Sequence, residues 1–198
     1  MSLHGTDAHV GMDALPDLVR RAVAAAREHG FALSCRPEQG RLLSVLAAGA
    51  PRAIAETGTG CGVGLAWLAS GAAPGVRLVS VERDLERARA AADVFRDRPE
   101  VEIVQGDWRR IEAYGPFDLL VLDGGGQAKG DGAADVDRLL SPGGTVVIDD
   151  FTPATTWPPH FDGAPDTARL HWLDHPSLRA TELRLAADLS VVVGRRLP

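Results

Sequence analysis

The stretch that most constrains the fold of this chain is residues 53–68, which read AIAETGTGCGVGLAWL. The apolar residues at its start predict a short buried strand, and the apolar segment beginning near Val63 predicts a helix. Between them, glycine occupies alternate positions at Gly58, Gly60 and Gly62. Glycine lets a ligand lie directly against the backbone, and the N-terminus of the following helix presents unpaired N–H groups to it. A strand, a glycine-rich turn and a helix in this order predict a nucleotide site at the carboxyl edge of a parallel sheet.

The spacing of the glycines narrows the kind of nucleotide. The dinucleotide fingerprint is G-x-G-x-x-G, and a fit that begins at Gly58 places Val63 where the third glycine should stand. A P-loop is excluded because no Gly-Lys-Ser or Gly-Lys-Thr follows the turn. Glu56, two residues before Gly58, is a poor neighbour for a pyrophosphate and a good one for a cation. The stretch therefore favours a cationic ligand without phosphate. These residues alone leave one alternative open, a tight turn that binds no ligand.

The rest of the chain alternates strand and helix patterns, which predicts an α/β fold with a doubly wound, mostly parallel sheet. The five predicted parallel strands cover residues 53–55, 76–81, 101–105, 117–122 and 145–148. Residues 151–175 predict a long loop, and residues 181–186 and 190–194 predict an antiparallel C-terminal hairpin, which brings the sheet to about seven strands. We expect a single domain over residues 1–198, with an N-terminal helical cover in 1–50 and the sheet core in 51–198.

Composition excludes several classes of protein. The net charge of −6 and the absence of a basic run argue against a nucleic-acid partner. No apolar run approaches the ~20 residues that a membrane-spanning helix needs, and the first residues lack the pattern of a signal peptide, so we expect a cytoplasmic protein without a membrane partner. The only two cysteines, Cys35 and Cys61, have neither metal-ligand spacing nor a disulfide pattern.

Acidic residues follow almost every predicted strand. They are Glu56, Glu82, Asp107, Asp123, Asp149 and Asp150. Ligands of doubly wound sheets bind outside the carboxyl ends of the strands, and a carboxylate after the second strand can accept hydrogen bonds from both ribose hydroxyls. Any one of these acids could be merely solvated, but their repetition favours a binding site.

These motifs resemble the class I methyltransferases that use S-adenosylmethionine (SAM), whose first motif is E/D-x-G-x-G-x-G. SAM carries an ammonium and a sulfonium and no phosphate, so it is the kind of cationic, phosphate-free ligand that the glycine spacing and Glu56 favour. The resemblance implies that Glu82 holds the ribose and that Asp107 contacts the adenine amino group. Trp108 could pack on the adenine ring, and a contact with a surface helix is the equally weighted alternative. The full set of cofactor-binding residues that it implies is Glu56, Gly58, Thr59, Gly60, Gly62, Glu82, Arg83, Asp107, Trp108 and Asp123.

The acids after the fourth and fifth strands resemble those of the catechol-type, cation-dependent O-methyltransferases. That family holds one divalent ion with an Asp after strand four and an Asp-Asn pair after strand five. The resemblance implies a metal site at Asp123, Asp149 and Asp150, and oxygen ligands favour Mg²⁺, Mn²⁺ or Ca²⁺. Two departures are that Asp150 replaces the family's Asn and that Gly126 stands where the family has a lysine base. Lys129, the only lysine, is the predicted base, with Asp123 as the second catalytic residue and a solvated loop position as the alternative for Lys129.

The predicted function is methyl transfer from SAM to an oxygen of a small phenolic or vicinal-diol acceptor. The alternatives are metal-independent transfer, a SAM-binding protein without catalysis, an aminopropyltransferase and, least favoured, an NAD-dependent oxidoreductase. The resemblance also allows a homodimer formed through the N-terminal helices. The long loop supplies further candidates, with His160, His171 and His175 as bases and Trp157, Phe161 and Trp172 as walls of an aromatic pocket.

Overall fold

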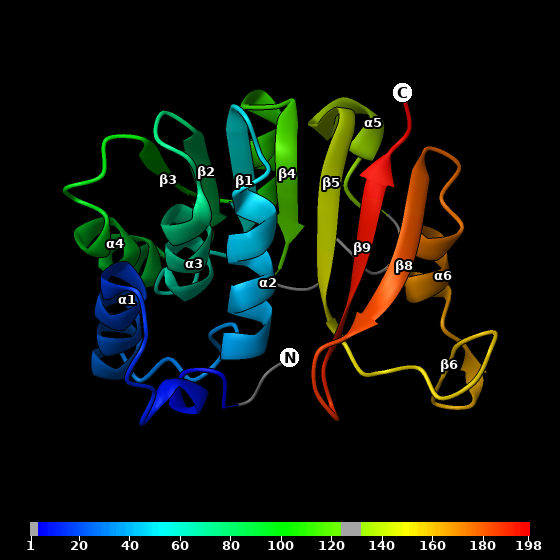
Figure 1. The fold of residues 1–198 in the computed structure, drawn as a ribbon, viewed down its shortest axis with the longest axis horizontal. Helices are drawn as coiled ribbons and strands as arrows, with labels where there is room; N and C mark the ends of the chain where they lie inside the picture. The colour runs from blue at the N-terminus through cyan, green and yellow to red at the C-terminus, as the bar shows by residue number, and fades with distance from the viewer. Residues whose placement is uncertain (1–3, 124–131) are drawn as a thin grey trace.

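The protein was analysed as a computed structural model that describes residues 4–123 and 132–198, with Asp150 described by its backbone alone. Seven strands form one sheet in the order β3-β2-β1-β4-β5-β9-β8 (Figure 1). The strands are β1 (Ala53–Thr57), β2 (Arg77–Glu82), β3 (Val101–Gln105), β4 (Phe117–Leu122), β5 (Leu140–Phe151), β8 (Leu178–Arg184) and β9 (Ser190–Arg196). The first five pair in parallel, whereas β9 is antiparallel to both β5 and β8. The predicted doubly wound sheet with a C-terminal antiparallel hairpin is therefore confirmed.

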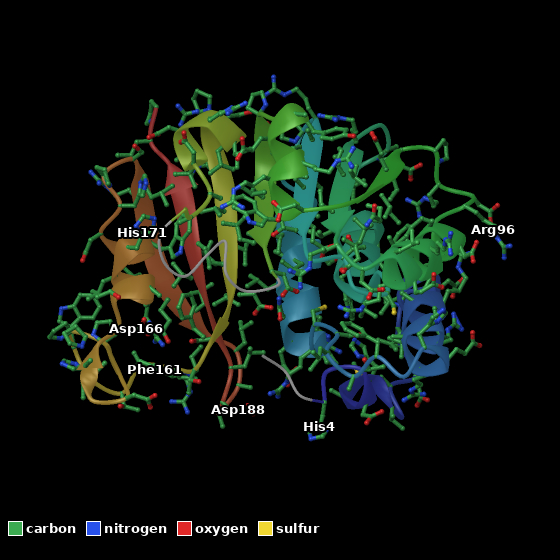
Figure 2. The ribbon with its side chains drawn as sticks, turned by 180° about the vertical axis from the view of Figure 1, so that it is seen from behind. His4, Arg96, Phe161, Asp166, His171 and Asp188 are labelled. Carbon is green, nitrogen blue, oxygen red and sulfur yellow. The ribbon has the colours of Figure 1, made fainter. Side chains whose placement is uncertain are left out.

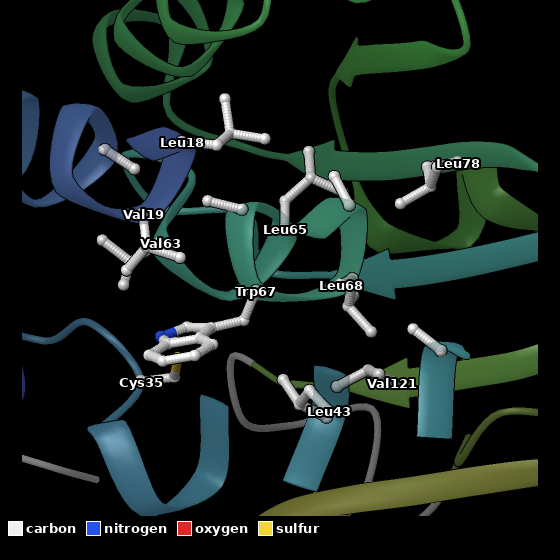
Figure 3. Close-up of a cluster of buried hydrophobic side chains, with 14 of the residues drawn as sticks. Leu18, Val19, Cys35, Leu43, Val63, Leu65, Trp67, Leu68, Leu78 and Val121 are labelled. Atoms are coloured by element: carbon white, nitrogen blue, oxygen red, sulfur yellow. The ribbon is translucent and has the colours of Figure 1, made fainter. Parts of the chain in front are cut away.

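Helices cover both faces of this sheet. One face carries α1 (Asp17–Glu28), α2 (Pro37–Ala47), α3 (Val63–Gly71) and α4 (Leu85–Val94), and α1 to α3 are nearest the viewer in Figure 1. The other face carries the 3-10 helix η2 (Trp108–Ala113), α5 (Val136–Leu139) and α6 (Thr167–Leu173). Strand residues alternate between the two resulting cores, and Figure 3 shows part of the first. Burial on both faces explains why the central strand β4 reads as an almost continuous apolar run. No helix in the described ranges is long and apolar enough to cross a membrane.

The segment from residue 151 to 175 is more ordered than the predicted loop. It contains a short antiparallel hairpin, β6 (His160–Phe161) with β7 (Ala164–Pro165), followed by α6. Asp166 caps α6 by accepting a hydrogen bond from the Arg169 backbone N–H at 3.0 Å. The helix is only seven residues long, too short for a recognisable helical repeat among so many prolines and histidines, although Asp166 is a typical N-cap residue.

Arg169 holds this segment against the sheet. Its side chain is buried, with 2% of the residue exposed. The guanidinium donates through Nε to Asp166 Oδ2 at 3.0 Å, through Nη1 to Glu182 Oε2 at 2.7 Å and through Nη2 to the Thr152 carbonyl at 2.6 Å. It also lies 5.0 Å from the centre of the Phe151 ring. One cation thus joins the end of β5 to α6 and β8.

Replacing Arg169 by methionine should lower the free energy of unfolding by about 3–5 kcal/mol, because it leaves the carboxylates of Asp166 and Glu182 without their cation. The matched control is Arg179→Met, on the exposed side of β8, which should change stability by less than about 0.5 kcal/mol. Urea unfolding followed by circular dichroism measures both. Equal small losses in the two variants would show that the buried ion pairs add little.

Candidate active site

The glycine turn lies at the carboxyl end of β1 and leads into α3. Gly58, Gly60 and Gly62 have φ angles of +82°, +55° and +92°, which side chains other than glycine rarely adopt. Space is also limited, because a Cβ on Gly60 would lie 2.7 Å from Cε1 of Phe31. Gly62 is the N-cap residue of α3. The backbone therefore requires these glycines, and the turn lies tightly against the segment that joins α1 to α2.

Glu56 lies beneath this turn and is 2% exposed. Its Oε2 accepts a hydrogen bond from Ser80 Oγ at 2.7 Å, and its Oε1 lies 2.3 Å from where a Cβ on Gly64 would stand. Burial raises the pKa of Glu56 to about 8. The hydrogen bond from Ser80 acts to lower this pKa, and the charges of Glu82 and Asp149 act to raise it. A cation beside this carboxyl group would favour its ionised form and recover part of the cost of burying it.

Glu82 joins the glycine turn to α4. Its Oε2 accepts the Gly60 backbone N–H at 2.8 Å and its Oε1 accepts the Asp84 backbone N–H at 2.9 Å. Asp84 in turn caps α4 through the Arg87 backbone N–H at 3.0 Å, as its position in the sequence predicts. Each carboxylate oxygen of Glu82 has capacity for a further hydrogen bond, so this buried group can accept ligand hydroxyls without giving up its backbone contacts.

The strand order places the carboxyl ends of β1, β4 and β5, which carry Glu56, Asp123 and Asp149, next to one another. Asp123 is fixed beside the end of β1 by two hydrogen bonds, from Thr57 Oγ1 to the Asp123 carbonyl at 3.1 Å and from the Asp123 N–H to the Thr57 carbonyl at 3.2 Å. Asp149 is buried in β5. Burial raises the pKa of the Cys35 thiol well above its usual value, and the charges of Glu56, Asp123 and Asp149 raise it further. All three carboxylates therefore act on one place at the sheet edge.

The predicted metal site and base are only partly described. Asp150 is described without its side chain, and Lys129 lies outside the described residues. Among the side chains that the structure does describe, no group of three or more His, Cys, Asp or Glu residues could hold a metal ion. The metal site at Asp123, Asp149 and Asp150 and the role of Lys129 stay predictions.

A pocket opens between the glycine turn and the segment that joins α1 to α2. Its lining includes five residues of the predicted site, Glu56, Gly58, Thr59, Gly60 and Asp123, together with Gly64. The other wall is made by Phe31, Leu33, Ser34 and Cys35. Sequence reasoning missed this second wall. The only local signal for it was an apolar, small-residue segment between two predicted helices.

The remaining predicted cofactor residues lie outside this pocket. Arg83 and Asp107 are exposed, and the Asp107 carboxylate caps η2 by accepting the Arg109 N–H at 3.1 Å. Trp108 is half-buried against the second core, with the Arg109 guanidinium 4.9 Å from its ring centre. The two alternatives for Trp108, packing on the adenine ring and packing on a surface helix, both stay predictions, as does the adenine contact of Asp107.

The aromatic residues of the segment 151–175 do not form a common wall. Trp157 and Phe161 are exposed, whereas Trp172 is fully buried in the second core. His171 lies on α6 with its ring centre 5.6 Å from that of His175. His160 is exposed and pairs through Nδ1 with the Pro158 carbonyl at 2.8 Å. Trp172 is therefore part of the second hydrophobic core.

Comparison with known proteins identifies the domain. Residues 55–151 match a family model described as a methyltransferase domain. These residues carry a methyltransferase domain. A putative O-methyltransferase from Mycobacteroides abscessus is 35% identical over 137 residues, covering 64% of each chain. Another, from Mycobacterium sp. (strain JLS), is 31% identical over 137 residues, covering 64% of this chain and 62% of the relative. The alignments thus span a little under two thirds of the length of these curated relatives.

Solved structures show that this methyltransferase domain has the class I fold. The SAM complex of the O-methyltransferase TomG from Streptomyces achromogenes aligns with a TM-score of 0.76 at 24% identity, covering 98% of this chain and 96% of TomG. Cofactor-bound Rv0187 from MTB aligns with a TM-score of 0.79 at 23% identity, covering 100% and 98% of the two chains. The predicted family and fold are confirmed.

Replacing Gly64 by alanine in the methyltransferase domain should lower the free energy of unfolding by about 1–3 kcal/mol, because the new Cβ would displace the buried Glu56 carboxyl group. The control is Gly49→Ala, where a Cβ would meet only the Leu46 carbonyl oxygen, at an ordinary 3.5 Å. Chemical denaturation of both variants tests this. A Gly64→Ala protein as stable as Gly49→Ala would mean that Glu56 can move at little cost.

Proposed function

We propose that this protein transfers the methyl group of SAM to an oxygen of a small phenolic or vicinal-diol acceptor. The observation that carries the proposal is the buried carboxyl group of Glu56, which lies against Gly64 at the glycine turn and whose pKa burial raises to about 8. Among the described residues that line the pocket beside it there is no lysine or arginine. A cationic, phosphate-free nucleoside meets the needs of such a site. The names of the curated relatives, putative O-methyltransferases, support oxygen as the acceptor atom.

Each predicted cofactor contact has a structural argument. Glu56 would face the SAM ammonium, because a neighbouring cation is what its buried carboxyl group lacks. Glu82 would accept the ribose hydroxyls with the capacity that its two backbone hydrogen bonds leave. The turn from Gly58 to Gly62, including Thr59, would lie against the cofactor backbone. Arg83, Asp107 and Trp108 would approach the adenine from the ends of β2 and β3.

The reaction is a single displacement. The acceptor oxygen forms a bond to the methyl carbon while the bond between that carbon and sulfur breaks. The electron pair of the broken bond stays on sulfur, so the sulfonium becomes the thioether of S-adenosylhomocysteine (SAH). The acceptor hydroxyl gives its proton to a base, for which Asp123 is placed at the pocket wall and Lys129 is the alternative. Because the methyl group is already activated, holding donor and acceptor in line is the protein's main contribution.

The cation-assisted form of this proposal places a divalent ion on Asp123, Asp149 and Asp150. It is supported by the parallel pairing of β4 and β5, which brings the strand ends that carry Asp123 and Asp149 to one edge of the sheet, since clustered carboxylates favour a bound cation. Such an ion would lower the pKa of the attacking oxygen. The displacement above does not depend on it.

A labelled-methyl assay tests the proposal. The protein is incubated with methyl-labelled SAM and a panel of catechols and simple phenols, with Mg²⁺ or with EDTA. We expect a labelled methyl ether, loss of at least tenfold in rate for Asp123→Asn, and no change for Asp93→Asn on the exposed face of α4. Loss of activity in EDTA supports the ion. SAM binding without turnover across the panel favours a non-catalytic SAM-binding protein, and thermal stabilisation by NAD but not SAM contradicts the proposal.

Cofactor binding should release a proton from Glu56. At pH 7 a carboxyl group with a pKa of about 8 is mostly protonated, and the ammonium of SAH would lower that pKa and expel the proton. We expect close to one proton released at pH 7, with SAH affinity rising from pH 6.5 to 8 and then levelling. Calorimetry in buffers of different ionisation enthalpy measures the release, and Glu56→Gln should abolish it. A wild-type heat that does not depend on the buffer would mean that Glu56 does not meet the ammonium.

A further inference from the structure

We propose that Thr6 is a positioning residue of the cofactor pocket, because it fixes the segment 31–35 that forms its second wall, and that His9 anchors the N-terminal segment carrying Thr6 to α3. The inference rests on the proposed SAM site and adds residues that lie outside the matched methyltransferase region, 55–151. In Figure 1 the N-terminal segment lies at the lower end of the molecule, where β4 and β5 end. It is therefore on the same edge of the sheet as the pocket.

Thr6 fixes three residues of the pocket wall. It is 2% exposed, and its Oγ1 donates to the Phe31 carbonyl at 2.6 Å. With that proton used, Oγ1 accepts from Ser34 Oγ at 2.8 Å, and the Thr6 N–H donates to the Ala32 carbonyl at 3.1 Å. Thr6 thus holds two of the four residues of this wall that line the pocket, Phe31 and Ser34.

His9 connects the N-terminal segment that carries Thr6 to α3. Its Nε2 accepts a hydrogen bond from Trp67 Nε1 at 3.4 Å, and its Nδ1 pairs with the Gly5 carbonyl at 3.0 Å. These contacts require the neutral ring with its proton on Nδ1. The Trp67 ring is held in turn by α2, since a Cβ on Gly40 would lie 2.2 Å from Trp67 Nε1. The N-terminal segment is therefore fixed to the helix that follows the glycine turn.

The surroundings of His9 favour that neutral ring. Burial lowers the pKa of His9, and the charge of Arg27 on α1 acts in the same direction. The backbone contacts with Gly5 and Thr6 and the charge of Glu38 on α2 act in the opposite direction. Because the folded-state pKa is lowered, the contribution of this contact is present above the ordinary histidine pKa and is lost as the pH falls through the folded value.

A second tie to the wall lies on the surface. Arg36 Nη1 pairs with Asp188 Oδ1 at 2.8 Å, in the turn between β8 and β9. Figure 2 shows Asp188 and His4 at the same end of the molecule. The Asp188 side chain is largely exposed, so solvent screens this pair and it adds little. Thr6, buried and making three hydrogen bonds, is the stronger restraint.

Cys35 provides a direct measure of how well the wall is held. It lines the pocket and is buried in the folded protein, so its alkylation by N-ethylmaleimide requires the wall to open. Thr6→Val removes the hydroxyl and keeps the shape, and should raise the rate of Cys35 alkylation about tenfold. It should also weaken SAH binding, measured by calorimetry, by roughly three- to tenfold. Peptide mapping by mass spectrometry separates Cys35 from Cys61.

The controls separate positioning from stability. Ser141→Ala removes another buried hydroxyl, one that contacts Arg52 at 3.4 Å beside the first residue of β1, and should leave both readouts unchanged. Thr6→Ser retains the hydroxyl and should restore wild-type labelling. If Thr6→Val does not fold, Ser34→Ala removes one of the three hydrogen bonds and should give a smaller rise in labelling.

Each result decides the matter. Cys35 labelling in Thr6→Val equal to that in Ser141→Ala overturns the anchoring role. Faster labelling with unchanged SAH affinity overturns the positioning role in cofactor binding. If the wild-type protein binds no SAH, the proposed function fails, and the labelling rates still decide whether Thr6 holds the wall.

Discussion

The candidate site depends on the burial of one carboxyl group, that of Glu56 at the end of β1. The group has little room, since Gly64 must lack a side chain beside it, and it accepts a hydrogen bond from Ser80 on the neighbouring strand. Its pKa is raised to about 8 because water is excluded. In the proposed function a ligand cation lies beside this acid, so the same packing that shapes the turn also accounts for the charge of the proposed ligand.

The sheet brings the other acids to this group. Because β1, β4 and β5 are parallel neighbours, their carboxyl ends share one edge, and Asp123 and Asp149 act with Glu56 on the same buried thiol. Glu82 reaches the glycine turn from the other side of β1, through the Gly60 N–H. The Arg169 contacts hold the chain that leaves β5. Local packing on both faces of the sheet thus orders a single functional edge.

Much of this arrangement could be predicted from sequence because it follows local patterns. The strands at 101–105 and 117–122 have the predicted bounds, and the Asp84 cap and the start of α3 at Val63 are as expected. The wall at 31–35 and its Thr6 anchor could not be predicted, because their hydrogen bonds join residues 25 and 28 positions apart without a repeating pattern. The helix α6 was missed because it is short and depends on the buried Arg169.

The contact between Thr57 and Asp123 joins residues 66 positions apart, across the centre of the sheet. Bringing such distant segments together carries a loop-closure cost that nearby helices do not have, and topologies rich in such contacts fold slowly. The pocket is formed on both sides of this contact, by the turn after β1 and by Asp123. A nascent chain that has emerged only as far as α4 contains the entire glycine turn and lacks Asp123, so the pocket is complete only once the fourth strand has joined the first.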